Sequence, residues 1–289
     1  MAIKNKINAL CDKCKNVPII GGILKPKPKI AVVRLSGVIA DSGLKRGGIS
    51  SQRFEHVLED AFDLYNAKAV ALIINSPGGS PAQSQLIGNL IRTLAEEKEI
   101  PVLAFVEDVA ASGGYWLACA ADEIYAVSTS IIGSIGVISA GFGAQELIAK
   151  YGIERRVHTS GTDKGFLDPF MEEKPADVKR LKALQKDLHT LFIDWVKERR
   201  GAKLSENDKT LFEGAFWSAI TALDYGLIDG LGQIKEICRS KYGEDVKFID
   251  LSPGKGLISS LVSSDAKLGL AEDAINTLEI KSIWARYGL

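Results

Sequence analysis

Short apolar runs alternate with amphipathic stretches through the middle of this chain. The runs have the length of buried strands and are expected at residues 30–33, 70–74, 102–106 and 123–127. Between them, apolar residues recur at spacings of three and four, which predicts helices over residues 51–65, 81–98 and 112–121. Strands that alternate with helices favour an α/β fold with a mainly parallel sheet and right-handed crossovers.

The second half of the chain continues this pattern less regularly. Residues 131–143 are rich in glycine and apolar side chains, which suggests tight backbone packing beside a cleft. The elements expected after them are a helix at 145–150, a strand at 154–158, an irregular loop at 159–173, a long helix at 176–200, a helix stopped by glycine within 216–231 and a last strand at 246–251. The predicted organisation is an N-terminal segment and linker (1–29), one domain (30–251) and a C-terminal extension (252–289).

Composition and charge narrow the class of protein. The chain has 289 residues, 46% of them hydrophobic, which is enough for a large core. Lys plus Arg and Asp plus Glu each number 36, so no net charge favours a nucleic-acid partner. Residues 1–24 hold no apolar run long enough for a spanning helix or a signal-peptide core. We therefore expect a cytoplasmic protein, and peripheral membrane contact through its basic N-terminal segment stays open.

The four cysteines give little evidence for a metal or cofactor site. Cys11 and Cys14 form a C-x-x-C pair, but no second pair stands at a zinc-ligand spacing. Cys119 and Cys238 are isolated, as small buried cysteines commonly are. We predict no metal, no cofactor and no disulfide framework.

Two glycine turns follow predicted strands directly. Asn-Ser-Pro-Gly-Gly-Ser occupies residues 75–80, and Ala-Ser-Gly-Gly-Tyr occupies residues 111–115. Ligands of parallel sheets bind beyond the carboxyl ends of the strands, so both turns can face one cleft. The first turn lacks the Gly-Lys-Ser/Thr ending of a P-loop and the G-x-G-x-x-G of a dinucleotide site, so phosphate binding is the weaker interpretation.

Ser112 is the candidate nucleophile. It stands where a strand ends and a helix begins, so an oxyanion formed there meets unpaired N–H groups and the positive end of the helix dipole. Gly113 and Gly114 leave room for a substrate near the backbone. The plainer alternative is that Ser112 only caps the helix.

The residues alone offer two kinds of base that could activate Ser112, a histidine or a lysine. The chain has three histidines, His56, His158 and His189, of which His158 is the stronger competitor because it precedes the 159–173 loop. Lysine also serves serine nucleophiles when it is neutral, and Lys164 lies in that loop with apolar neighbours that could desolvate it. A lysine chosen at random is usually exposed, however.

Several motifs together resemble the signal peptide peptidase A family of serine peptidases, peptidase family S49. The similarity spans about residues 30–251 and rests on segments 75–80, 111–115, 133–137, 160–164 and 212–232. The resemblance implies a ClpP/crotonase-like fold with Ser112 as nucleophile and Lys164 as general base. It further implies that Ser134 orients the lysine and that the N–H groups of Gly79 and Gly113 form the oxyanion hole.

The resemblance also implies an assembly. Single-repeat members form homo-oligomeric rings in which neighbouring subunits share the dyad, and the same is expected here. The chain departs from the family by carrying Asp163 beside Lys164, and its sequence shows no membrane anchor of the kind that well-known bacterial members have.

The function expected is a serine endopeptidase that cleaves short or unfolded hydrophobic peptides, such as signal-peptide remnants, through an acyl-enzyme. One alternative is a catalytically silent ClpP-like scaffold that binds peptides or partner proteins. Another is a crotonase-type acyl-CoA enzyme, for which no adenine or phosphate site is evident.

Overall fold

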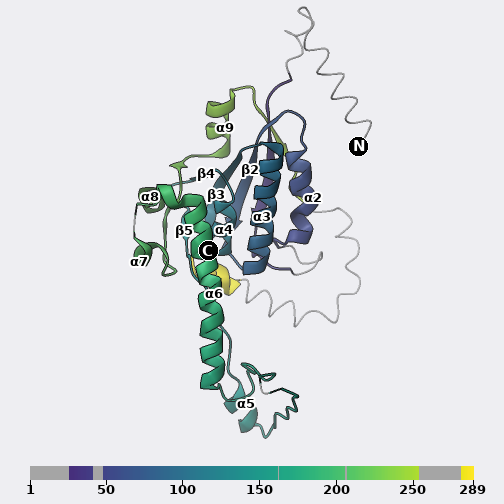
Figure 1. The fold of residues 1–289 in the computed structure, drawn as a ribbon, viewed down its shortest axis with the longest axis vertical. Coiled ribbons are helices and arrows are strands. Elements are labelled where there is room, and N and C mark those ends of the chain that lie inside the picture. The colour runs from purple at the N-terminus through teal and green to yellow at the C-terminus, as the bar shows by residue number, and fades with distance from the viewer. Residues whose placement is uncertain (1–25, 42–47, 162, 206, 254–280) are drawn as a thin grey trace, which may run out of the picture.

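The structure is a computed structural model that describes residues 26–41, 48–161, 163–205, 207–253 and 281–289 (Figure 1). The N-terminal segment with Cys11 and Cys14 lies outside these residues, as does most of the predicted C-terminal extension. Within the described ranges, no helix combines the length and the apolar character that crossing a bilayer requires.

The centre of the fold is one sheet of eight strands. Its order is β6-β5-β3-β2-β1-β8, and β4 pairs with both β3 and β7. The strands are β1 (Lys29–Ser36), β2 (Ala67–Ser76), β3 (Val102–Ala111), β4 (Glu123–Ala126), β5 (Ile131–Gly133), β6 (Phe216–Ser218), β7 (Gly230–Leu231) and β8 (Lys247–Asp250). All pairs are parallel except β5 with β6. The α/β class with a mainly parallel sheet is therefore confirmed.

Helices cover both faces of this sheet. They are α2 (Ser51–Phe62), α3 (Pro81–Lys98), α4 (Gly113–Cys119), α5 (Gln145–Lys150), α6 (Pro175–Arg200), α7 (Asp208–Leu211), α8 (Ala219–Asp224) and α9 (Ile234–Tyr242), with a 3-10 turn at Gly201–Lys203. Alternate residues of β1 face opposite sides: Val33 joins the core beneath α2, α3 and α4, whereas Val32 joins the cluster that α9 covers. Figure 1 shows α2 and α3 side by side, with α9 set apart from them.

The strand β3 carries two partners on one edge. Its first half pairs with β4 through Leu103–Val106, and its last three residues pair with β5. This strand continues five residues beyond the apolar run that predicts it, to Ala111. The extension brings the end of β3 next to the end of β5, where the candidate nucleophile follows.

Two expectations from the sequence are wrong. Residues 154–158 form no strand; every one of them is exposed, and none has a ladder partner among the described residues. Residues 216–231 are not one helix but β6, α8 and β7, because Phe216–Ser218 pairs with β5 as an antiparallel edge. In both places, the spacing of apolar residues does not show whether a partner strand lies alongside.

The long helix α6 is anchored at one end only. Its C-terminal part packs against α4, where Trp195 stacks on Trp116 with ring centroids 5.9 Å apart. Its N-terminal part extends away from the sheet together with α5 and the loops on either side of α5 (Figure 1). Large apolar side chains are exposed along this extension, namely Ile138, Phe142, Leu147, Tyr151, Ile153, Val157, Phe170 and Leu184.

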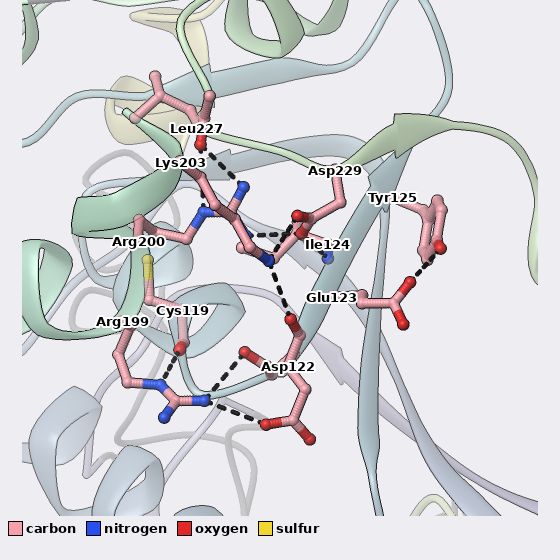
Figure 2. A network of polar contacts seen from close by, with 12 residues as sticks. Cys119, Asp122, Glu123, Ile124, Tyr125, Arg199, Arg200, Lys203, Leu227 and Asp229 are labelled. Atoms are coloured by element: carbon pink, nitrogen blue, oxygen red, sulfur yellow. Dashed lines mark hydrogen bonds and ion pairs between the residues drawn. The ribbon is translucent and has the colours of Figure 1, made fainter. Parts of the chain in front are cut away.

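A buried ion pair fixes the anchored end of α6 (Figure 2). Arg200, only 1% exposed, donates to the Asp229 carboxylate at 2.6 Å and to the carbonyl of Gly226. Lys203 also binds Asp229 at 2.6 Å, and Arg199 donates to the carbonyl of Cys119 at the end of α4. The network thus ties α6 to the helix that begins beside Ser112.

The charge of Asp229 depends on these partners. Burial by itself would raise the pKa of this carboxyl, but the hydrogen bonds from Arg200 and Lys203 outweigh burial and hold the pKa below its usual value. A carboxyl whose folded pKa is lowered stabilises the fold above its unfolded pKa, and this contribution is lost as the pH falls through the folded value.

We expect Asp229→Asn to lower the free energy of unfolding by about 3 kcal/mol at pH 7, because Arg200 is left buried without a counter-charge. Urea denaturation at fixed protein concentration measures this loss, which should shrink below about pH 4. The control is Glu59→Gln, which removes an exposed carboxylate beside His56 and should change stability by less than about 0.5 kcal/mol. Equal stability of Asp229→Asn and wild type at pH 7 would contradict the anchoring role.

Candidate functional site

Ser112 sits at a sharp turn between β3 and α4. Its backbone has φ 51° and ψ −125°, a region that residues other than glycine rarely adopt. The turn is fixed from both sides: the Ser112 N–H donates to the carbonyl of Gly133 at 2.8 Å, and its carbonyl accepts from the N–H groups of Tyr115 and Trp116. Such a conformation costs on the order of 1–3 kcal/mol, so the surrounding structure must hold it.

Helix capping does not account for this serine. A capping serine normally has an extended backbone and accepts a hydrogen bond from the first turn. Ser112 has a positive φ, and its side chain makes no capping bond. Ser112 is half-buried and lines a cavity.

The two glycine turns meet at Ser112, as the sequence predicts. A Cβ on Gly78 would lie 2.8 Å from the Cβ of Ser112, so only glycine allows this approach. A Cβ on Gly113 would lie 3.4 Å from the backbone nitrogen of Gly79. Within the described residues, neither Gly79 nor Gly113 donates its N–H to the protein. Two unused donors therefore lie together beside the hydroxyl.

Ser134 occupies the matching position on the neighbouring strand. Ala111 and Gly133 are paired in the β3–β5 ladder, so Ser112 and Ser134 are the residues that follow a paired position. Ser134 also has a positive φ of 54°, and its N–H donates to the carbonyl of Ala215 at 2.6 Å. The three sequence-predicted groups at this end of the sheet, Ser112, the glycine pair and Ser134, are thus brought together.

A cavity opens beside Ser112. It is lined by Gly79, Pro81, Ser84, Ser112, Gly113, Trp116, Gly136, Val137, Leu188 and Phe192. Trp116 of α4 and Leu188 and Phe192 of α6 give this lining apolar surface, and Ser112, Gly79 and Gly113 belong to the same lining. The expectation that residues 131–143 pack tightly beside a cleft holds for Gly136 and Val137, which line the cavity, but is wrong for residues 138–143, which are exposed.

Lys164 is not brought to Ser112 within one chain. Its loop is tied to the first turns of α6, where Asp163 pairs with Arg180 at 2.6 Å and Leu167 donates its N–H to Asp177. Arg180 precedes Phe192, which lines the cavity, by twelve residues, or about 18 Å of helix. The Lys164 side chain is exposed and contacts no acidic group in the described part of the chain. Arg180, rather than Lys164, takes up the adjacent carboxylate.

Among the described residues, two of the histidines are exposed and the third is already bonded to the backbone. His56 is exposed on α2 beside Glu59, and His158 is exposed on the projecting segment. His189 is the nearest to the site, but its Nε2–H donates to the carbonyl of Ile135 at 3.2 Å and so links α6 to the end of β5.

The two described cysteines are structural, and one contact near the site was not expected. Burial raises the pKa of the Cys119 thiol to about 12, and that of Cys238 likewise to about 12, so both are unreactive buried thiols, as predicted. Sequence reasoning missed Tyr287, whose hydroxyl donates to the Ser134 hydroxyl at 3.3 Å. Nothing in the pattern of the C-terminal residues points to that contact, because 153 residues separate the two partners.

Comparison with known proteins identifies the family to which the chain is similar. A family model described as peptidase family S49 matches residues 95–245. A protein of Synechocystis named putative protease slr0021 is 30% identical over 88% of this chain and 90% of its own length. A Brucella abortus protein named Na(+)/H(+) antiporter NhaA is 48% identical over 90% of this chain, which spans only 37% of that protein's length.

A solved structure supports the fold alone. A mutant of the membrane-bound stomatin-specific protease 1510-N, in complex with a substrate peptide, superposes with a TM-score of 0.52 and 18% identity. The match covers 82% of this chain and 98% of the other. The fold is thus that of the ClpP/crotonase-like proteins.

We expect Ser112→Gly to be more stable than Ser112→Ala by about 1 kcal/mol, because glycine adopts the positive φ without the cost that alanine keeps. Chemical denaturation of both variants measures the difference. The matched control is Ser36, an exposed residue at the end of β1, where glycine should be less stable than alanine. An alanine variant at position 112 as stable as the glycine variant would show that the turn is not strained.

Proposed function

The chain belongs to peptidase family S49, a family of serine peptidases, and we propose that it is an endopeptidase in which Ser112 is the nucleophile and Lys164 of a neighbouring subunit is the general base. The observation that carries the proposal is the arrangement of groups around Ser112. The backbone of Ser112 is strained, its hydroxyl makes no capping hydrogen bond, and two unused N–H groups and an apolar cavity lie beside it.

The proposed reaction gives each of these groups one role. Ser112 Oγ attacks the peptide carbonyl carbon while its proton passes to the neutral amine of Lys164, and the carbonyl oxygen becomes an oxyanion held by the N–H groups of Gly79 and Gly113. The tetrahedral intermediate collapses, the C–N bond breaks, and the protonated lysine returns the proton to the leaving amine. Water then hydrolyses the acyl-enzyme with Lys164 again as base. No step requires a metal or cofactor.

The proposal that Ser112 and Lys164 of one site come from different subunits rests on the geometry of α6. Within one chain, the Lys164 loop is tied to the far end of this helix, and intrahelical geometry keeps it away from the cavity. The same projecting segment exposes large apolar side chains, with Phe142 at 93% and Tyr151 at 70%, as expected of a surface that packs against another copy. A head-to-tail ring brings the projection of one subunit to the site of the next. Packing there also removes water, which favours the neutral form of an amine.

The cavity supports the substrate class. Trp116, Val137, Leu188 and Phe192 supply apolar surface next to Ser112. Small or apolar side chains beside the cleaved bond gain from burial there, whereas charged ones lose hydration. Short or unfolded hydrophobic peptides, such as signal-peptide remnants, fit this preference.

A silent peptide-binding scaffold is the second candidate, and one observation favours it: the single chain holds its nucleophile and its lysine apart. Such a scaffold would bind apolar peptides through the same cavity without cleaving them. Activity measurements on the assembled protein separate the two.

We expect Ser112→Ala and Lys164→Ala each to reduce hydrolysis of an unstructured apolar peptide by at least about 1000-fold, because the nucleophile and its base act as one unit. Initial rates measured with a fluorogenic peptide test this, and circular dichroism confirms folding. Lys174→Ala is the matched control, since it removes the exposed lysine that directly precedes α6 and should keep near-full activity. Full activity in Lys164→Ala would remove that residue from the mechanism. An inactive wild type would instead support the silent peptide-binding scaffold.

We also expect the two inactive variants to complement each other. Subunits of Ser112→Ala and Lys164→Ala, mixed in equal amounts, dissociated in mild denaturant and reassembled, should recover about a quarter of wild-type activity, because that share of interfaces joins an intact serine to an intact lysine. Each variant taken alone through the same steps is the control. No recovery in mixed oligomers whose mixing is verified by mass spectrometry would rule out a dyad shared between subunits.

A further inference from the structure

The C-terminal residues lie against the turn that holds Ser134. Residues 281–285 are helical, and the chain then curls back, with the N–H groups of Tyr287 and Leu289 both donating to the carbonyl of Trp284. Figure 1 shows this segment in yellow, and the contacts of Tyr287 with Phe216 and Ser134 place it beside β6 and the end of β5. Tyr287 is half-buried only two residues from the end of the chain.

Two contacts fix the Tyr287 side chain. Its ring meets that of Phe216 edge-on, with centroids 5.1 Å apart and an interplanar angle of 67°. Its hydroxyl donates to Ser134 Oγ at 3.3 Å. Phe216 pairs with Gly133 in the β5–β6 ladder, so the aromatic contact holds the phenol beside the residue that follows Gly133. The ring packing therefore aims the hydroxyl at Ser134.

The hydrogen-bonding capacity of Ser134 shows what this contact does. A serine hydroxyl has one proton and two acceptor sites, and its proton rotates freely unless a partner fixes it. Tyr287 occupies one acceptor site and so restricts Ser134 Oγ to orientations in which one acceptor site and one donor remain. The amine of an incoming lysine can donate to the remaining acceptor site.

We propose that Tyr287 is a positioning residue, which holds the Ser134 hydroxyl in the orientation that receives the catalytic lysine. This inference rests on the proposed function, since it assigns Tyr287 a place behind the Ser112 and Lys164 pair. Tyr287 touches neither substrate nor nucleophile and acts only through Ser134.

Tyr287→Phe tests the proposal because it keeps the ring that packs on Phe216 and removes only the hydroxyl. In the full-length oligomer, kcat for peptide hydrolysis should fall about fivefold, the scale of one hydrogen bond, while KM and the melting temperature stay unchanged. The matched control is Arg286→Gln, an exposed neighbour on the same segment, which should keep wild-type kcat.

A double-mutant cycle shows whether the effect passes through Ser134. In a Ser134→Ala background, Tyr287→Phe should cause no further loss, because the group it positions is gone. An unchanged or increased kcat in Tyr287→Phe, or losses that multiply in the double variant, would overturn the proposal. A fall in stability together with a raised KM would also overturn it, as it would indicate a packing role. If the wild type lacks Ser112-dependent hydrolysis, both this inference and the proposed function fail; if only Tyr287→Phe behaves like wild type, the proposed function stands.

Discussion

The site depends on the parallel pairing of β5 with the last residues of β3. This ladder ends with the Ser112 N–H bound to the Gly133 carbonyl, and that bond holds the strained turn in place. Because paired strands lie about 4.8 Å apart, the residues following the pair are neighbours as well. Two serines with positive φ therefore lie beside each other at the carboxyl ends of β3 and β5, and the glycine turn after β2 packs against Ser112. The proposed nucleophile Ser112 and its neighbour Ser134 are thus placed by one register, and the turn after β2 adds Gly79 to them.

The second constraint is the uneven attachment of α6. Its C-terminal turn is held by a buried guanidinium, while its N-terminal half has no sheet beneath it. Removing the Arg200–Asp229 pair from water costs free energy, which is offset only when both side chains are fully hydrogen-bonded. The Gly226 carbonyl satisfies Arg200, and Lys203 satisfies Asp229. The anchored part lines the cavity, and the projecting part carries the loop with Lys164. One helix thus serves both the recipient and the donor side of the proposed shared site.

Much of this could be predicted from the sequence where local chemistry decides the outcome. Apolar runs marked β1, β2 and β3, and Pro81 marked the start of α3, since these signals depend on residues close in the chain. The glycine turns predicted the cleft and Ser112 within it. Residues 154–158 and 216–218 could not be assigned correctly, because strand formation needs a partner that periodicity does not reveal. The left-handed backbone at Ser112 was equally hidden, since it is imposed by Gly133, and the Tyr287 contact joins positions too distant for any local pattern.

The projection of Lys164 away from its own chain's cavity has a consequence for the life of the protein after synthesis. Under the proposed shared dyad, a lone newly made subunit holds a nucleophile without a base. The activity per subunit then rises with the concentration of the protein, because the active site forms only on association, and dilution lowers this activity. A peptidase built this way would protect its neighbours from indiscriminate cleavage without an inhibitor or a propeptide, because the geometry of one long helix delays chemistry until assembly is complete.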